Sequence, residues 1–312
     1  MHNLLILGGS GFIGSALARD ASRKYRLTAT YNSLEPAPFA NILWLNCRLP
    51  DDFPRLEHTI DRSSADVVID CIALSNVEAC ELEPHRANLL NAELPRRLAG
   101  ICHGIGVRLI YLSTEYVFDG IKGNYIESDT PRPINHYGET KLLGEKATLQ
   151  FQQNLVIRTS LAYGWDKRCR FLNFVVDNLH AAKAIGLFSD QMSCPTLVTD
   201  LTTGILRAAE IGLSGICHVA GPECVSRYEF GCAIARHWGL DVRLLTEAKS
   251  SQIKTLAKRP ANSCLSNKKA CSALGMRFAD VDTGLAVVVD DSRKALSKTR
   301  SSGQFSASAK TF

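Results

Sequence analysis

The first fourteen residues limit the possible folds of this chain more than any other segment. Residues 3–7 (Asn-Leu-Leu-Ile-Leu) predict a buried parallel strand, and a helical pattern runs from residue 15 to residue 23. Glycines stand between them: Gly8 permits a tight turn, Gly11 lets the backbone approach a pyrophosphate, and Gly14 lets helix and strand pack closely. The order of strand, glycine turn and helix therefore predicts a Rossmann-type dinucleotide-binding unit, in which the helix N-terminus faces the phosphates.

Strands and helices alternate along the first half of the chain. A long helix is predicted at 83–102, and apolar runs predict further strands at 26–31, 42–45, 66–71, 107–112 and 155–158. Such alternation predicts an α/β fold with a doubly wound parallel sheet and right-handed crossovers.

The alternation is lost after residue 165, which predicts a second, smaller lobe. Its expected elements are helices at 170–183, 200–211 and 226–239, a short strand at 216–219 that returns to the sheet, and another at 242–245. From residue 294 the chain is rich in Ser, Lys, Gly and Ala and has little to bury, so we expect a disordered tail. The predicted division is a Rossmann domain at 1–165, a substrate-binding lobe at 166–293 and a tail at 294–312.

Composition excludes several other classes of protein. Hydrophobic residues make up 46% and charged residues 21% of the 312, as in an ordinary globular enzyme. The net charge of +5 comes from scattered basic residues, so we expect no nucleic-acid partner. No apolar run is long enough to span a membrane and no signal sequence is evident, so we expect a cytoplasmic protein. The 11 cysteines are odd in number and lack a Cys-x-x-Cys pair, which predicts reduced thiols and no metal site.

A tyrosine and a lysine stand four residues apart, at Tyr137 and Lys141. On a helix these positions share one face, and a nearby ammonium lowers the pKa of a phenol from its ordinary value of about 10. Such a phenol can exchange a proton near neutral pH. Ser113 and Thr114 follow the strand at 107–112, at the edge of the sheet where ligands bind. Strand alternation lets only one of these two hydroxyls face the site.

Several motifs in a fixed order resemble the extended short-chain dehydrogenase/reductase superfamily, and within it the dTDP-4-dehydrorhamnose reductase family. They are the glycine turn, LSTEYVFDG at 112–120, NHYGETKLLGE at 135–145, IRTS at 157–160, Asp190-Gln191 with Pro195-Thr196, and RPANS at 259–263. The resemblance runs from residue 3 to about residue 285. It implies NAD(P)H-dependent reduction of a 4-keto group on a nucleotide-linked deoxysugar, with a dTDP-linked sugar as the expected substrate.

The resemblance also implies a role for each matching residue. Tyr137 donates the proton, Lys141 lowers its pKa and holds the nicotinamide ribose, and Thr114, chosen over Ser113, hydrogen-bonds the substrate carbonyl. The cofactor-binding positions are Gly8, Ser10, Gly11, Phe12, Ile13, Gly14, Tyr31, Asn32, Ala73, Tyr137, Lys141, Thr159 and Ser160. The substrate-binding positions are Glu115, Val117, Phe118, Gln191, Thr196 and Arg259, and the arginine suits a diphosphate. Asn91 matches a residue that supports the active-site backbone or a proton-relay water, although an exposed helix position is equally compatible with the pattern.

The end of the second predicted strand favours NADP(H) over NAD(H). The sequence Tyr31-Asn32-Ser33 has no Asp or Glu to bind a ribose 2′-hydroxyl, and therefore no charge that repels a 2′-phosphate. No arginine takes that place, although Lys24 or Arg26 is near enough in sequence to approach the phosphate.

Three departures from the family pattern leave the substrate and the activity open. Glu115 stands where the family usually has Asp, Asn46 or Cys47 where an acidic residue is common, and Met192-Ser193-Cys194 replaces a Gly-containing segment. One alternative is a sugar-nucleotide epimerase or dehydratase that retains NAD. Another is a non-catalytic NADP-binding protein that resembles the regulatory subunit of methionine adenosyltransferase. Because the family sometimes dimerises, a homodimer is also considered.

Overall fold

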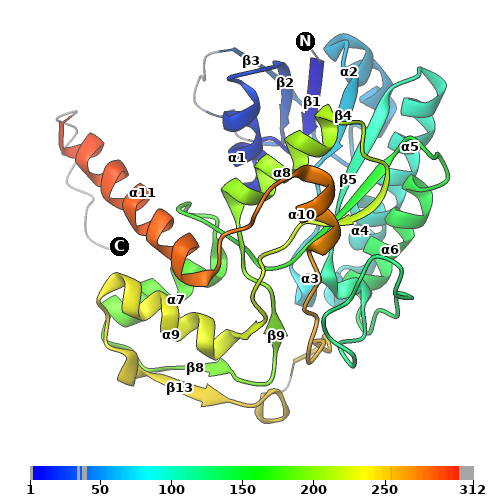
Figure 1. Ribbon diagram of the computed structural model, residues 1–312. Helices are drawn as coiled ribbons and strands as arrows, with labels where there is room; N and C mark the ends of the chain where they lie inside the picture. The colour runs from blue at the N-terminus through cyan, green and yellow to red at the C-terminus, as the bar shows by residue number, and fades with distance from the viewer. Residues whose placement is uncertain (1–2, 34–35, 37–40, 254, 302–312) are drawn as a thin grey trace.

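A seven-stranded sheet forms the centre of the molecule, and every pair of neighbouring strands in it is parallel. The computed structural model describes residues 3–33, 36, 41–253 and 255–301. In spatial order the strands are β11 (Gly215–His218), β6 (Leu155–Thr159), β5 (Arg108–Thr114), β4 (Val67–Asp70), β1 (Asn3–Leu7), β2 (Arg26–Tyr31) and β3 (Ile42–Asn46). The strand order reverses between β1 and β4, the point at which ligands bind to doubly wound sheets. The predicted Rossmann-type α/β fold is confirmed (Figure 1).

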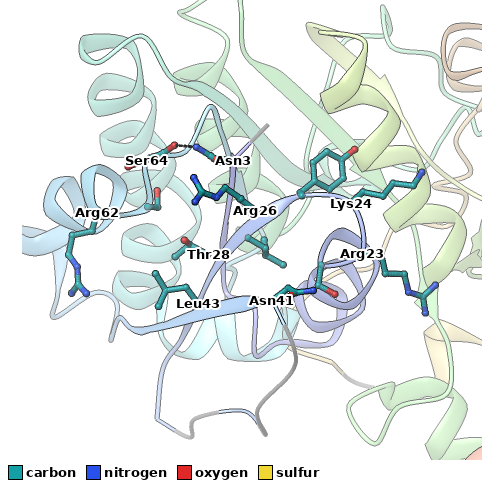
Figure 2. Close-up of a pocket in the computed structure, with 13 residues that line it drawn as sticks. Asn3, Arg23, Lys24, Arg26, Thr28, Asn41, Leu43, Arg62 and Ser64 are labelled. Atoms are coloured by element: carbon teal, nitrogen blue, oxygen red, sulfur yellow. Dashed lines mark hydrogen bonds between the residues drawn. The ribbon is translucent and has the colours of Figure 1, made fainter. Parts of the chain in front are cut away.

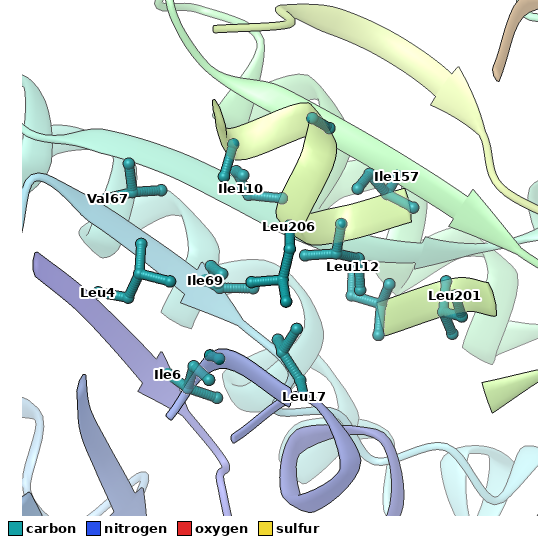
Figure 3. Close-up of a cluster of buried hydrophobic side chains, with 14 of the residues drawn as sticks. Leu4, Ile6, Leu17, Val67, Ile69, Ile110, Leu112, Ile157, Leu201 and Leu206 are labelled. Carbon is teal, nitrogen blue, oxygen red and sulfur yellow. The ribbon is translucent and has the colours of Figure 1, made fainter. Parts of the chain in front are cut away.

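Both faces of the sheet are buried, as near-continuous apolar strands require. Leu4 and Ile6 of β1 enter one core, which Figure 3 shows together with side chains from the helices that cover it. Leu5 and Leu7 alternate with them and enter the core on the opposite face. The covering helices are α1 (Phe12–Ala21) and α8 (Val198–Glu210) on the first face, and α2 (Leu56–Ser63) and α5 (Leu94–Gly104) on the second.

The helix predicted at 83–102 is interrupted by one π-helical turn. After α3 (Val77–Leu82), α4 (Pro84–Asn88) passes into the turn η2 (Leu89–Glu93) before α5 begins. Pro95 accounts for the change, because it has no N–H to donate to the carbonyl four residues earlier. That carbonyl, on Asn91, accepts instead from the Tyr111 hydroxyl at 2.8 Å.

Asn91 is fully buried, so its interpretation as an exposed helix residue is wrong. Its side-chain amide exchanges hydrogen bonds with the backbone of Leu74, at 2.9 Å to the N–H and 3.2 Å to the carbonyl. The same Nδ2 donates to Thr140 Oγ1 at 3.1 Å. Asn91 thereby joins the loop after β4 to α6 (His136–Thr148).

A second apolar core lies beyond the sheet, at the lower left of Figure 1. Leu172, Ile234 and Leu285 are among its buried side chains. Its elements are α7 (Arg170–His180), α9 (Arg227–Trp238), α11 (Val281–Ser301) and the parallel strand pair β8 (Ile185–Phe188) and β13 (Leu245–Ala248). Among the described residues, no helix is both long enough and apolar enough to cross a membrane.

Two predicted boundaries in this lobe are wrong. The strand expected at 242–245 begins only at Leu245, because the Asp241 side chain accepts from the Arg243 N–H at 2.9 Å and starts a 3₁₀ turn first. Regular structure also does not end at 293, since α11 continues to Ser301. The i,i+4 ion pair between Asp290 and Lys294, at 2.5 Å, lies across the predicted boundary and supports the helix there. The rest of the predicted tail, 302–312, lies outside the described residues.

The prediction of reduced thiols throughout is also wrong, because Cys224 and Cys264 form a disulfide. They are 40 residues apart, and only the fold brings them together. Cys264 belongs to the segment after Arg259, whose Asn262 N–H donates to the Gly120 carbonyl at 3.0 Å. The bond therefore fastens that segment to the loop before β12 (Val225–Ser226). Nine other cysteines are free thiols.

We expect Cys224→Ser to lower the free energy of unfolding by about 2–4 kcal/mol, because the disulfide closes a loop of this length in the unfolded chain. Denaturant unfolding without a reducing agent measures the change, and Cys271→Ser, which removes a free thiol, is the matched control. In the presence of a reducing agent the difference between Cys224→Ser and wild type should vanish. Equal stability of the two proteins without reductant would contradict the disulfide.

Candidate active site

The glycine turn between β1 and α1 forms a cradle without room for side chains. Gly8 has a φ of +75°, and its carbonyl oxygen accepts from the Gly11 N–H at 2.9 Å. A Cβ on Gly14 would lie 2.1 Å from that oxygen, so only glycine fits there. Gly11, the N-cap of α1, supplies no side-chain hydrogen bond, and the first turn of the helix has no acidic residue. This helix end, which also carries Ser10, Phe12 and Ile13, therefore suits an anion such as a pyrophosphate.

The end of β2 carries Tyr31 and Asn32, whose carbonyls accept from the Cys47 N–H at 2.9 Å and from Asn46 Nδ2 at 2.7 Å. Lys24 and Arg26 lie at the opposite, amino edge of the sheet, where they line a hollow of about 610 Å³ (Figure 2). A strand as long as β2 spans about 17 Å. The expectation that Lys24 or Arg26 approaches a 2′-phosphate at the carboxyl edge is therefore wrong.

α6 presents Tyr137 and Lys141 to the carboxyl end of β5. Its N-cap is Asn135, whose side chain accepts from the Gly138 N–H at 2.8 Å. A Cβ on Gly138 would lie 2.1 Å from the Tyr116 carbonyl oxygen, so glycine lets the helix approach the segment after β5. The aromatic rings of Tyr116 and Tyr137 meet edge to face, 5.7 Å between centroids.

Thr114 and Ser113 point to opposite sides of β5. The Thr114 side chain lies beside Tyr137 and donates to Glu115 Oε2 at 2.9 Å. Ser113 turns away and donates to the buried Glu145 at 2.6 Å. The structure thus brings the predicted hydroxyl, Thr114, together with Tyr137 and leaves Ser113 outside the site.

The ammonium of Lys141 is engaged by the backbone of β5. The Lys141 side chain is 1% exposed, and Nζ donates to the Leu112 carbonyl at 2.7 Å and lies 3.9 Å from the centroid of the Tyr111 ring. Burial lowers the pKa of Lys141 to about 8, although the negative charges of Asp70 and Glu145 oppose that shift.

The expected lowering of the Tyr137 pKa by Lys141 is wrong for this arrangement. The Tyr137 pKa is raised, first by burial and then by the negative charge of Glu115, while the hydrogen bond with Thr114 partly offsets the rise. None of the main contributions comes from Lys141, whose Nζ is engaged with Leu112. The phenol is consequently in its protonated form near neutral pH, the form that can donate a proton.

Glu115 lies at the junction of the two lobes, buried beside the Thr114 hydroxyl. Burial raises its pKa, whereas a hydrogen bond with Ser160 and the positive charge of Arg227 lower it. Arg227, the first residue of α9, is also hydrogen-bonded to Tyr116, and its guanidinium lies 5.4 Å from the centroid of the Phe171 ring. Sequence reasoning missed Arg227, because its one local signal is its position directly after Ser226, the N-cap of α9.

The predicted residues near the nicotinamide end also lie at the carboxyl edge. Thr159 pairs with Thr114 in the register of β5 and β6, and its buried Oγ1 has no hydrogen-bond partner among the described residues. Ser160 Oγ accepts from the Cys194 N–H at 3.1 Å. Ala73 is half-buried in the loop after β4. An orphan hydroxyl at this edge of the sheet, on a strand that β5 and β4 separate from the glycine cradle, is compatible with a ligand group that completes its hydrogen bonding.

Three of the six residues predicted to bind the substrate are packed in the interior instead. Val117 and Phe118 belong to a buried apolar cluster, in which Phe118 stacks on Tyr125 with 4.1 Å between ring centroids. The buried Thr196 hydroxyl donates to the Cys194 carbonyl at 3.0 Å and accepts from the Gly221 N–H at 3.1 Å. These side chains are therefore engaged by contacts within the protein.

Gln191 and Arg259 lie at the margin of the site. The Gln191 carbonyl accepts from the Arg227 N–H at 3.2 Å, which ties the predicted substrate loop to the start of α9. Arg259 Nη1 donates to Glu78 Oε1 at 2.7 Å and to the Ala257 carbonyl at 2.8 Å. The Arg259 side chain is 21% exposed, so its guanidinium is partly accessible. The ion pair with Glu78 joins the segment around Arg259 to α3.

Comparison with known proteins places this geometry in a family. Residues 1–294 match the family described as RmlD substrate binding domain. A probable low-salt glycan biosynthesis reductase of Haloferax volcanii is 31% identical, covering 91% of this chain and 96% of the relative. A dTDP-4-dehydrorhamnose reductase of Aggregatibacter actinomycetemcomitans is also 31% identical, covering 90% and 96%. The crystal structure of a hypothetical dTDP-4-dehydrorhamnose reductase from Sulfolobus tokodaii has a TM-score of 0.79 at 34% identity, covering 90% and 98%. The predicted resemblance is confirmed.

We expect Gly14→Ala to abolish dinucleotide binding, because the new Cβ would collide with the Gly8 carbonyl and open the cradle. Gly100→Ala, in the exposed part of α5, is the matched control: nothing lies within 4 Å of a Cβ there, and alanine should stabilise the helix by up to about 1 kcal/mol. Fluorescence titration with NADPH measures the first effect and thermal unfolding the second. Wild-type affinity in Gly14→Ala would contradict the cradle.

Proposed function

This chain belongs to the RmlD substrate binding domain family, and from that premise we propose that it catalyses the NAD(P)H-dependent reduction of a 4-keto group on a nucleotide-linked deoxysugar. The single observation that carries the proposal is the placement of Thr114, at the carboxyl end of β5, beside Tyr137 at the start of α6, with Lys141 one helical turn away. A dTDP-linked sugar is the proposed substrate, since relatives with this activity in their names match nearly the whole chain.

The residues present fit a dinucleotide. The glycine cradle and the uncapped N-terminus of α1 suit its pyrophosphate, and the unpartnered Thr159 hydroxyl suits a polar group at the other end of the cofactor. When bound, the nicotinamide supplies the hydride that reduces the carbonyl carbon.

The protein groups manage the charge that develops on the carbonyl oxygen. Tyr137 donates its proton to that oxygen, and the Thr114 hydroxyl, on turning its one proton from Glu115 to the same oxygen, holds the carbonyl in place. Lys141, which is charged near neutral pH and lies one helical turn from Tyr137, is the proposed contact of the nicotinamide ribose. Glu115, paired with the charge of Arg227, fixes the Thr114 side chain from the other side.

We propose NADP(H) as the preferred cofactor. The support is the absence of a carboxylate at Tyr31 and Asn32, which would repel a 2′-phosphate and bind a 2′-hydroxyl. For the diphosphate of the sugar nucleotide, Arg259 and Arg227 are the proposed cations, because both lie at the junction of the lobes.

Two alternatives have distinct outcomes in the same assays. A protein that oxidises and re-reduces its substrate retains NAD and shows no net redox change. A non-catalytic binding subunit binds NADPH but oxidises none of it with any ketosugar.

We expect Tyr137→Phe to lower kcat for ketosugar reduction by about 10²–10⁴-fold, because the proton donor is removed. The Kd for NADPH should change less than about twofold. Tyr228→Phe, which removes a phenol on α9 outside the site, is the control and should retain full activity. NADPH oxidation measured at 340 nm tests both variants, and a fully active Tyr137→Phe enzyme would rule out the mechanism.

The pH profile should report the charge of Lys141. A lysine is charged below its pKa, so the cation is present at neutral pH and is lost as pH rises through about 8, the lowered value that burial gives. We therefore expect kcat/KM for the ketosugar to be flat near neutral pH and to fall above about 8. A profile that stays flat to pH 10 would show that this charge is not required.

A further inference from the structure

Arg168 reaches from the second lobe onto the back of the glycine turn. It lies in the loop between β7 (Ala162–Tyr163) and α7. Its Nη1 donates to the carbonyl of Ser10 and, at 3.1 Å, to that of Gly11. Its Nη2 donates to the Ser15 hydroxyl at 2.7 Å. One guanidinium thus contacts Ser10 and Gly11 of the glycine turn and Ser15 near the start of α1.

Asp166 holds this guanidinium in place. Arg168 Nε donates to Asp166 Oδ1 at 2.7 Å and Nη2 donates to Oδ2 at 2.5 Å, the bidentate geometry that arginine favours. Burial alone would raise the pKa of Asp166, but the hydrogen bonds from Arg168 lower it, so the carboxylate is ionised. Together the five contacts engage every N–H of the guanidinium.

We infer that Arg168 is a positioning residue of the cofactor site, which fixes the glycine turn so that its N–H groups are directed at the dinucleotide pyrophosphate. In a peptide unit the N–H and C=O point in opposite directions, so a donor that holds the Gly11 carbonyl on one side orients the Phe12 N–H toward the other. The Gly11 N–H, which follows the Ser10 carbonyl, is engaged by the Gly8 carbonyl and keeps the turn closed. Gly11 gives α1 no side-chain cap, so the N–H groups at the start of the helix are not taken up by a side chain, while the guanidinium holds the carbonyls of the turn.

The contact also joins the two lobes. The turn lies between β1 and α1 of the sheet domain, whereas Arg168 lies two residues before α7, which packs in the second core. The inference rests on the proposed function only in taking the ligand to be a dinucleotide. Because no N–H of Arg168 is left over, it acts through the turn and not by direct contact with a phosphate.

Arg168→Met removes the contacts and keeps an unbranched side chain, and Lys167→Met is the matched control, since it removes an exposed cation of the neighbouring residue. Hydrogen–deuterium exchange of the amides at 8–15 in the ligand-free protein should become about tenfold faster in Arg168→Met and stay unchanged in Lys167→Met. The Kd values for NADPH and for NADH should both rise about tenfold, as expected for the loss of charge-assisted hydrogen bonds. At saturating NADPH, kcat and the ketosugar KM should stay within about twofold of wild type.

Several results would overturn the inference. An unchanged rate of hydrogen exchange together with an unchanged Kd in Arg168→Met would do so. Weaker binding of NADPH with unchanged binding of NADH would also do so, because that pattern indicates a direct contact with the 2′-phosphate. Arg168→Lys keeps the charge but not the planar fork, so it should restore protection only in part, and full restoration would also count against a positioning role. Should Arg168→Met fail to fold, Ser15→Ala removes one of the Arg168 contacts, together with the hydrogen bond from Ser15 to the Phe12 carbonyl, and should give a smaller change in the same direction. A chain that reduces no ketosugar would refute the proposed function and leave these exchange and binding measurements intact.

Discussion

The geometry of the catalytic groups depends on one buried ion pair, between Glu145 of α6 and Arg158 of β6. Each side chain is 2% exposed, and the two contacts are 2.7 and 2.9 Å long. Glu145 lies one turn beyond Lys141, so the pair fixes the rotation of α6 and turns Tyr137 and Lys141 toward the end of β5. Loss of either partner would leave a buried charge unpaired, at a cost of about 3–5 kcal/mol.

The neighbours of this pair explain why Thr114 faces the site. Ser113 donates to Glu145, and alternation along β5 sends Thr114 to the opposite side. On the far side, Arg158 Nη1 lies 3.3 Å from His218 Nε2, and His218 Nδ1 lies 3.2 Å from the Tyr125 carbonyl. Burial, with the charge of Arg158, lowers the His218 pKa to about 3, so the neutral ring accepts from the arginine and donates to the carbonyl. These contacts hold β5, α6, β6 and β11 together around the base of the site.

Local sequence patterns predicted much of the fold and of the candidate site. Most of the features that these patterns missed depend on contacts between residues far apart in the sequence. The glycine turn works through its own backbone, so Gly8, Gly11 and Gly14 could be predicted from their spacing between a strand and a helix. Motif identity, by contrast, did not reveal that Phe118 points into an apolar cluster, because orientation depends on Tyr125 and its neighbours in the fold. Arg168 carries no local signal, since its partners at the glycine turn lie more than 150 residues away in sequence. The disulfide and the shifted pKa of Tyr137 likewise depend on which groups the folded chain brings together.

The direction of the Tyr137 pKa shift bears on the choice between net reduction and a reaction that begins with oxidation. Reduction needs an acid at the substrate oxygen, whereas an epimerase or dehydratase first removes a hydroxyl proton and needs a base. Burial and the charge of Glu115 keep the phenol protonated, and the ammonium of Lys141 is engaged by the Leu112 carbonyl and does not reverse this. Tyr137 therefore rests near neutral pH in its acid form, although its raised pKa makes it release that proton less readily. Reduction begins from this protonated state, whereas an oxidation-first reaction begins only once the phenol has lost its proton.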